Sequence, residues 1–103
     1  MKYFLGITTF PDLETARSVS KKLLEYKLCV CINVLEGADS LYWWEGKIQE
    51  EKEVIVFIKT KEQNISLLKE KIKELHPYQV PELIFLQIEE GLKEYLNWVE
   101  REC

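Results

Sequence analysis

The sequence predicts an α+β fold: a ferredoxin-like βαββαβ sandwich with an extended hairpin between its second and third strands and a C-terminal helix. Apolar, β-rich runs alternate with segments whose apolar residues recur at helical spacing, in the order strand, helix, strand, strand, helix, strand, helix. The 103 residues fit one domain spanning residues 1–103. A hydrophobic fraction of 47% is enough to build a packed core.

The first half of the chain predicts a strand, a helix and a second strand. Residues 2–9 form an apolar, β-branched run, and Asp12 is a suitable N-cap for the helix that follows. That helix extends to about residue 26, and the second strand covers residues 29–35, with a break at Gly37. The apolar face of the helix consists of Leu13, Ala16, Val19, Leu23 and Leu24.

The second half predicts the rest of the hairpin, a helix, a strand and a final helix. Residues 41–48 continue the extended chain, and the polar residues 49–52 form a corner before the third strand, residues 53–60. Thr60 and Gln63 have the spacing of a capping box. The last elements are a helix with Ile65, Leu68, Ile72 and Leu75 on one face, ended by His76 and Pro77, a strand at 83–88, and a helix with Leu92, Tyr95, Leu96 and Val99 on one face.

The aromatic segment 41–48 predicts that the protein is a homo-oligomer. Strand alternation places Leu41 and Trp43 on one side of the strand. Tyr42 and Trp44 fall on the other side, so both faces carry large apolar groups. The second strand of a ferredoxin-like sheet is an edge strand, where exposed aromatic residues promote aggregation. Another subunit is the simplest cover, and the alternative is that one tryptophan simply lies on the surface.

Charge and cysteine content limit the partners and the compartment. The net charge is −4 and no run of basic residues offsets it, so nucleic acid is a poor partner. No apolar run approaches the roughly 20 residues that span a bilayer, so no membrane insertion is expected. The first nine residues have the pattern of a strand and not of a signal peptide. An odd number of cysteines, three, indicates reduced thiols in a cytoplasmic protein.

Several distinctive blocks follow one another over nearly the whole chain. They are Cys31-Ile32-Asn33-Val34, residues 40–47 (SLYWWEGK), Lys59-Thr60, His76-Pro77-Tyr78, Val80-Pro81-Glu82 and Tyr95-Leu96-Asn97-Trp98. Together they resemble the CutA family of divalent-cation (copper) tolerance proteins. The resemblance implies a ferredoxin-like homotrimer that pairs its long second and third strands between subunits, and a cytoplasmic protein that binds copper or other divalent ions.

The resemblance places the candidate metal ligands at Cys31 and His76, and Cys29 adds a thiol where we expect a small residue in the family. Thiolates favour copper(I), whereas imidazole and carboxylate favour copper(II). Cys31 has an alternative interpretation as an inert, buried residue on a central strand. His76 has one as a cation at a helix C-terminus. Cys103 is expected on a flexible tail.

The same blocks supply residues that we expect at subunit interfaces or in structural roles. The charged residues among them have an alternative as cross-strand ion pairs. These interface or structural residues are Tyr42, Trp44, Glu45, Lys47, Lys59, Tyr78, Pro81, Glu82 and Trp98.

The sequence favours a binding protein over an enzyme. There is no nucleophile elbow, no glycine-rich phosphate loop and only one histidine. Paired CxxC or HxxxH motifs are also missing, so no metal is expected to be required for folding. The main hypothesis is a trimeric divalent-cation (copper) binding and tolerance protein. The alternatives are a trimeric sensor, like the PII proteins, with a small anionic ligand in its intersubunit clefts, and a scaffolding trimer with incidental metal binding.

Overall fold

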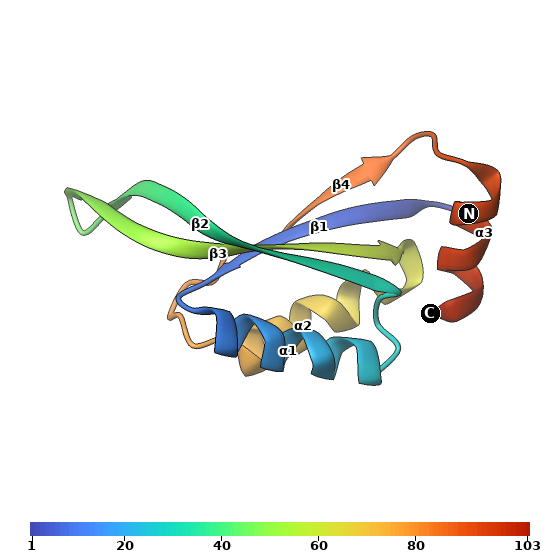
Figure 1. The fold of residues 1–103 in the computed structure, drawn as a ribbon, viewed down its shortest axis with the longest axis horizontal. Helices are drawn as coiled ribbons and strands as arrows, with labels where there is room; N and C mark the ends of the chain where they lie inside the picture. The colour runs from blue at the N-terminus through green and yellow to red at the C-terminus, as the bar shows by residue number, and fades with distance from the viewer.

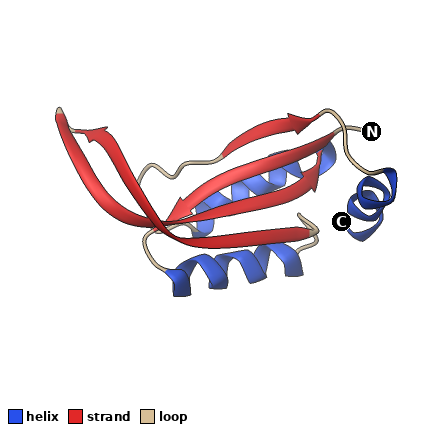
Figure 2. Cartoon of the chain, turned by 45° about the horizontal axis from the view of Figure 1, so that its top comes forward, coloured by secondary structure: helices blue, strands red, loops and turns tan.

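The computed structural model describes residues 1–103 and has the predicted order of elements. They are β1 (Tyr3–Phe10), α1 (Leu13–Glu25), β2 (Cys31–Trp44), β3 (Lys47–Lys61), a short 3₁₀ helix η1 (Glu62–Asn64), α2 (Ile65–Leu75), β4 (Ile84–Ile88) and α3 (Lys93–Glu102). The strands form one antiparallel sheet in the order β2-β3-β1-β4. Helices α1 and α2 lie on one face of this sheet, and α3 lies at one end of it (Figures 1 and 2). The fold class predicted from the sequence is confirmed.

The core fills the space between the sheet and the two covering helices. Alternate residues of each strand point toward the helices, because successive side chains of a strand project to opposite faces. Buried members of this core include Phe10, Ala16, Val19, Leu23, Val54, Val56, Ile58, Leu68 and Ile72. Asp12 caps α1 as predicted, since its Oδ1 accepts a hydrogen bond of 2.7 Å from the Thr15 backbone N–H.

The predicted capping box at the start of α2 is wrong. The N-cap of α2 is Asn64, and no side chain caps the helix. Thr60 still lies in β3, where its hydroxyl is fully buried and donates a hydrogen bond of 2.7 Å to the carbonyl of Leu28. The spacing to Gln63 therefore carries no cap, because η1 separates the strand from the helix. His76 is the C-cap of α2, as predicted.

Strands β2 and β3 form a long hairpin whose outer part, residues 38–53, projects beyond the helices (Figure 1); we call this part the arm. The predicted corner at residues 49–52 is wrong, because these residues lie inside β3. The chain reverses instead at Glu45 and Gly46, which both have positive φ (48° and 77°). Gly37 does not end the second strand either: it falls at a shift in register between Leu35 and Ala38, after which β2 continues.

Candidate functional site

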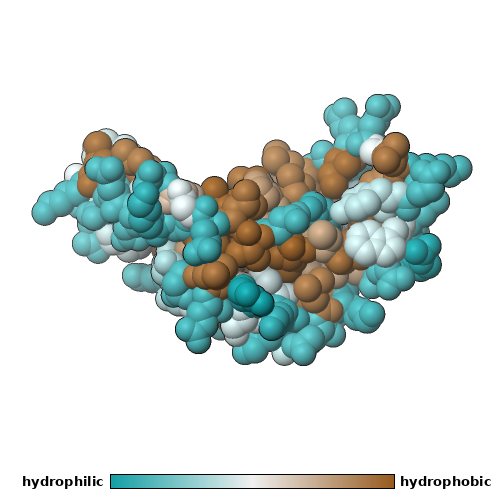
Figure 3. All heavy atoms as spheres, viewed as in Figure 1, coloured by the Kyte–Doolittle hydropathy of each residue, from teal (hydrophilic) through white to brown (hydrophobic).

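The face of the sheet opposite α1 and α2 is apolar, and α3 meets it only at one end, where the Tyr3 hydroxyl donates to Glu100 Oε2. Its residues come from all four strands and share one face because they are opposite one another in the strand register. Leu35, Ile84 and Leu86 are 46%, 51% and 54% exposed. Figure 3 shows apolar side chains gathered across the hollow between the arm and the α3 end. This open face consists of Leu5, Ile7, Leu35, Ile55, Phe57, Ile84 and Leu86.

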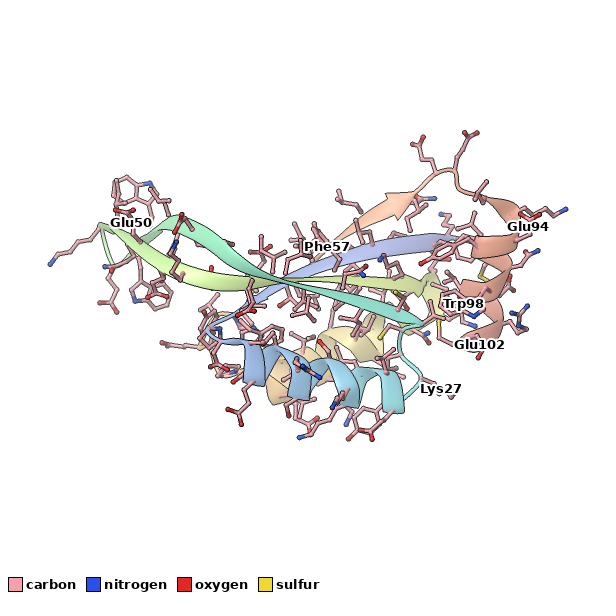
Figure 4. The ribbon with its side chains drawn as sticks, viewed as in Figure 1. Lys27, Glu50, Phe57, Glu94, Trp98 and Glu102 are labelled. Carbon is pink, nitrogen blue, oxygen red and sulfur yellow. The ribbon has the colours of Figure 1, made fainter.

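The arm carries apolar residues on both of its sides, as the alternation of the sequence predicts. Leu41, Trp43 and Ile48 lie on one side, and their exposed fractions are between 62% and 71%. Tyr42 and Trp44 lie on the other side and are 36% and 39% exposed. Figure 4, which labels Glu50 near the tip, shows side chains projecting from both sides of the arm. An arm of this composition has little of its own core to stabilise it.

A groove of about 860 Å³ lies between the arm and the loop that follows α2. Aromatic side chains form part of its wall, and four carboxylates and no cationic side chain line it. The carboxylates belong to Asp39, Glu51, Glu53 and Glu82. The aromatic residues are Tyr42, Trp43, Trp44 and Tyr78. The groove is therefore acidic, and it is suited to cationic and not to anionic groups.

A hydrogen-bonded chain connects the end of α2 to the base of the arm. The Tyr78 hydroxyl donates to Glu53 Oε2 at 2.7 Å, and the Tyr78 backbone N–H donates to His76 Nδ1 at 3.1 Å. Because Nδ1 accepts, the proton of the neutral ring is assigned to Nε2, which donates to the Thr9 carbonyl at 2.6 Å. His76 also stacks on Phe10 with ring centroids 4.4 Å apart. These contacts fix the loop that forms one wall of the groove.

Burial and the carboxylates of the groove shift several pKa values, among them those of His76, Tyr78 and Glu82. Burial lowers the pKa of His76 below its ordinary value, although its hydrogen bond to Thr9 and the charge of Glu53 act in the opposite direction. Burial raises the pKa of Tyr78, and the hydrogen bond to Glu53 raises it further. The pKa of Glu82 is raised by desolvation and then by the nearby charge of Glu53.

The structure does not bring the predicted metal ligands together. Cys31 pairs with Lys59 of β3, and Lys59 pairs in turn with Leu5 of β1. His76 is hydrogen-bonded to Thr9, which lies four residues beyond Leu5 along β1. Four residues of a strand span about 13 Å. No group of three His, Cys, Asp or Glu side chains is arranged to hold a metal ion.

The two neighbouring cysteines occupy different environments. The strand begins at Cys31, so Cys29 lies before it and is 2% exposed in the core. Cys31 is half-buried, and its strand is at the edge of the sheet, which corrects our placement of it on a central strand. Lys59 Nζ lies 3.9 Å from Cys31 Sγ and also contacts Asn33 Oδ1.

The other predicted residues divide between the groove and the ends of the molecule. Tyr78 and Glu82 line the groove, and Pro81 is half-buried between them. Glu45 lies in the exposed turn at the tip, and Lys47 directly follows this turn. Trp98 belongs to α3, and its ring centroid lies 5.6 Å from that of Tyr95.

The cross-strand ion pairs that were the alternative interpretation of the charged residues do not form in the single chain. The cross-strand pair that does form joins Lys52 to Asp39. The sequence did not predict that Asp39 and Glu51 line the groove. Glu51 and Glu53 share one face of β3, but the predicted corner at residues 49–52 left Glu51 outside that strand.

Comparison with known proteins identifies the family to which this fold and this arm belong. A family model described as CutA1 divalent ion tolerance protein matches residues 4–102. The chain belongs to the CutA1 divalent ion tolerance family. A divalent-cation tolerance protein CutA of Pyrococcus horikoshii is 48% identical over 92% of this chain and 92% of its own length.

Solved CutA structures share the fold closely. The divalent cation tolerance protein (Cut A1) of Thermus thermophilus is 39% identical over 97% of each chain, with a TM-score of 0.95. A CutA of Archaeoglobus fulgidus, described as a periplasmic divalent cation tolerance protein, is 35% identical over 97% of each chain, with a TM-score of 0.94. The resemblance to CutA noted in the sequence is thus confirmed. No helix of this CutA-family chain is long and apolar enough to cross a membrane.

Proposed function

We propose that this chain forms a homotrimer that binds a divalent cation, with copper among its cations, and that it has no enzymatic activity. The observation that carries the proposal is the open face, where Leu35, Ile84 and Leu86 are 46–54% exposed in the single chain. Contiguous exposed apolar surfaces are typical of protein interfaces. Three is the number of copies that we propose, because it is the number that the resemblance to CutA implies.

The arm supports assembly through a second surface. Its edge strand β2 has backbone groups free for pairing along the side that β3 does not occupy. Both of its sides carry aromatic residues, so a neighbouring copy that receives the arm would bury Trp43 as well as Trp44. Pairing of the long hairpin between subunits would then cover the strand edge and both faces at once.

Cation binding is proposed for a site that assembly completes. One chain offers no ready group of three ligands, so a site with more ligands needs a second subunit. Carboxylates of the groove suit hard divalent ions, and the Cys31 thiol suits copper(I). Both ring nitrogens of His76 are engaged in hydrogen bonds, so its use as a ligand requires that one of these bonds break. The acidic lining of the groove disfavours the alternative of a small anionic ligand there.

Light scattering tests the assembly. We expect a mass three times the 12.3 kDa of one chain. Leu86→Glu puts a charge on the open face and should yield monomers, whereas Gln87→Glu, the next residue on the same strand, should leave the trimer intact. A wild-type monomer at micromolar concentration would contradict the proposal.

Titration of copper(I) into reduced protein, and of copper(II) into a second sample, tests the cation. Cys31→Ser should weaken copper(I) binding by at least about tenfold, and Cys103→Ser serves as a matched thiol control. His76→Ala should change the affinity little. A chelator should leave the melting temperature unchanged, because no metal is expected to be required for folding. Unchanged copper binding in Cys31→Ser would remove this residue from the proposal, and absence of binding altogether would favour the scaffolding alternative.

We propose that the protein is located in the cytoplasm, because all three of its cysteines are free thiols. Cys29 and Cys31 are the nearest pair in the sequence, but Cys29 lies in the core and Cys31 at the sheet edge. Cell fractionation of the source organism with an antibody to the protein tests this location. Recovery in a periplasmic fraction would contradict it.

A further inference from the structure

The acidic groove between the arm and the loop after α2 holds more negative charge than the chain neutralises. Of its four carboxylates, that of Asp39 is paired with Lys52. The other three, those of Glu51, Glu53 and Glu82, take part in no ion pair. No cationic side chain lines the groove, so three negative charges border one cavity without a positive partner.

Glu53 is the buried member of these three residues. It is 8% exposed, and its hydrogen bond within the chain is the one that the Tyr78 hydroxyl donates to Oε2. A carboxylate that leaves water is normally paired with a cation, because its desolvation is costly. Desolvation, and then the charge of Glu53, raises the pKa of the Glu82 carboxyl. Both observations indicate that the groove lacks a compensating positive charge.

The walls of the groove also carry aromatic rings. Register and strand alternation place Tyr42 on the face of the arm that carries Glu51 and Glu53. Tyr78 adds a ring from the loop after α2. An aromatic face attracts an ammonium group, and it packs against the methylene groups of a chain that carries one. Rings and carboxylates together therefore make a surface that suits organic cations.

The size of the groove distinguishes an organic cation from a single metal ion. Its volume of about 860 Å³ lies within the range of small-molecule sites, which is roughly 300–1,000 Å³. Within one chain, no three of its carboxylates are arranged to hold one metal ion. A single metal ion would therefore leave most of the groove empty, and it would leave at least one of the three carboxylates without a partner.

We propose that the groove binds a linear polyamine, a flexible chain of methylene groups that carries several ammonium groups. The ammonium groups donate hydrogen bonds to the three unpaired carboxylates. The methylene segments lie against the rings of Tyr42 and Tyr78. The proposal goes beyond the metal binding proposed above, because it involves neither Cys31 nor a metal ion, and the groove belongs to a single chain.

Isothermal titration calorimetry of spermidine, a linear triamine, into the full-length protein tests the proposal. The protein is first treated with a chelator and dialysed. We expect saturable binding of one spermidine per chain, with an affinity that falls as salt is added, because salt screens the attraction between charges. Magnesium and tetramethylammonium, titrated into separate samples, should each bind at least about tenfold more weakly, because neither spans the three carboxylates.

Two neighbouring residues of β3 supply a matched pair of variants. Glu50 and Glu51 are both exposed, but Glu51 lines the groove and Glu50 points to the other face of the arm. Glu51→Gln should weaken spermidine binding by at least about tenfold, whereas Glu50→Gln should change it less than about twofold. Tyr42→Leu, which removes a ring, should weaken it by about threefold. Cys31→Ser should leave spermidine binding unchanged.

Light scattering on each sample separates this proposal from that of the trimer. Spermidine binding by a monomeric protein would support the groove site even though the trimer would then be wrong. A trimeric wild type that binds no spermidine would overturn the proposal and indicate that a neighbouring copy fills the groove. Equal losses in Glu50→Gln and Glu51→Gln would overturn it as well, because binding would then follow surface charge alone. Equal affinity for magnesium would overturn it in favour of inorganic cations.

Discussion

The two long strands β2 and β3 pass through two different environments, the helix-covered part of the sheet and the arm. In the covered part Val56 and Ile58 of β3 are completely buried by α1 and α2. In the arm Trp43 and Ile48 are 71% and 64% exposed, although they are large and apolar like the core residues. The same kind of sequence therefore has a complete core in one place and none in the other.

This difference separates what the single chain stabilises from what we propose a neighbouring copy stabilises. Each Å² of apolar surface that is buried contributes about 25 cal/mol of stabilising free energy. The covered part gains this contribution when one chain folds. For the arm and the open face this contribution is available only on assembly. Substitutions in the two regions should consequently affect different measurements, one the unfolding of the chain and the other the association of copies.

The largest effect is expected for Phe10→Ala in the covered part. Phe10 is fully buried and stacks on His76, so the variant should lose about 3–5 kcal/mol of unfolding free energy. Denaturant unfolding measures the loss, and light scattering should still give the native assembly in buffer. Phe10→Leu, which keeps most of the volume, should cost less than about 1.5 kcal/mol. Equal losses in the two variants would show that the cavity is not the cause.

Trp44→Ala in the arm should act mainly on association. Trp44 is 39% exposed in the chain, and we expect a partner to cover the remainder, so the variant should weaken assembly by about 2–4 kcal/mol. Mass measured over a dilution series checks this. Tyr26→Ala, which removes an aromatic ring that is 52% exposed on the helix side, is the matched control. A Trp44→Ala variant that associates as well as the control would indicate that the arm is not an interface.

Local patterns predicted the covered part well, because its signals lie within a few residues of one another. The helical stripe of α1 and the Asp12 cap are of this kind, and both are confirmed. The arm was predicted less accurately. Asn-Gly and Asp-Gly are the usual signals for a two-residue turn. Here Glu45 has the positive φ before Gly46, so this signal is missing, and the polar residues 49–52 were predicted as the turn instead.

The candidate site was largely beyond local patterns, because its residues come together only through the topology. Glu53 and Tyr78 are separated by 25 residues and meet at the base of the arm. The last turn of α3 meets the end of β3, where Lys61 Nζ donates to the Glu100 carbonyl, and no spacing in the sequence indicates this contact. The resemblance to CutA identified the sequence blocks that contain Tyr78 and Glu82, but it did not predict which residues these two side chains contact.

His76 and Tyr78 connect the covered part to the base of the arm, and the titration of His76 should make the free energy of unfolding depend on pH. Burial lowers the folded-state pKa of His76, so the neutral ring is favoured in the folded protein. The stabilisation is fully present above the unfolded pKa of about 6.5 and is lost as the pH falls toward the lower folded value. Melting temperatures from pH 8 to pH 5 measure this loss, and His76→Gln should reduce it. A melting temperature of the wild type that rises on acidification through this range would contradict the assignment of a neutral ring.

The smallest effect is expected for the ion pair between Lys52 and Asp39 in the arm, whose Nζ–Oδ1 distance is 2.7 Å. Both side chains are largely exposed in the single chain, 76% and 66%, so water and salt should reduce their coupling to about 0–0.5 kcal/mol. A double-mutant cycle with Lys52→Gln and Asp39→Asn measures this coupling, and the pair Lys71–Glu74 on α2 is its counterpart in the covered part. If both couplings are small and salt-sensitive, the pair in the arm is solvated even in the assembly. A coupling above about 1 kcal/mol that persists in high salt would instead mean that a neighbouring copy covers this part of the arm, because desolvation strengthens the attraction between the two charges.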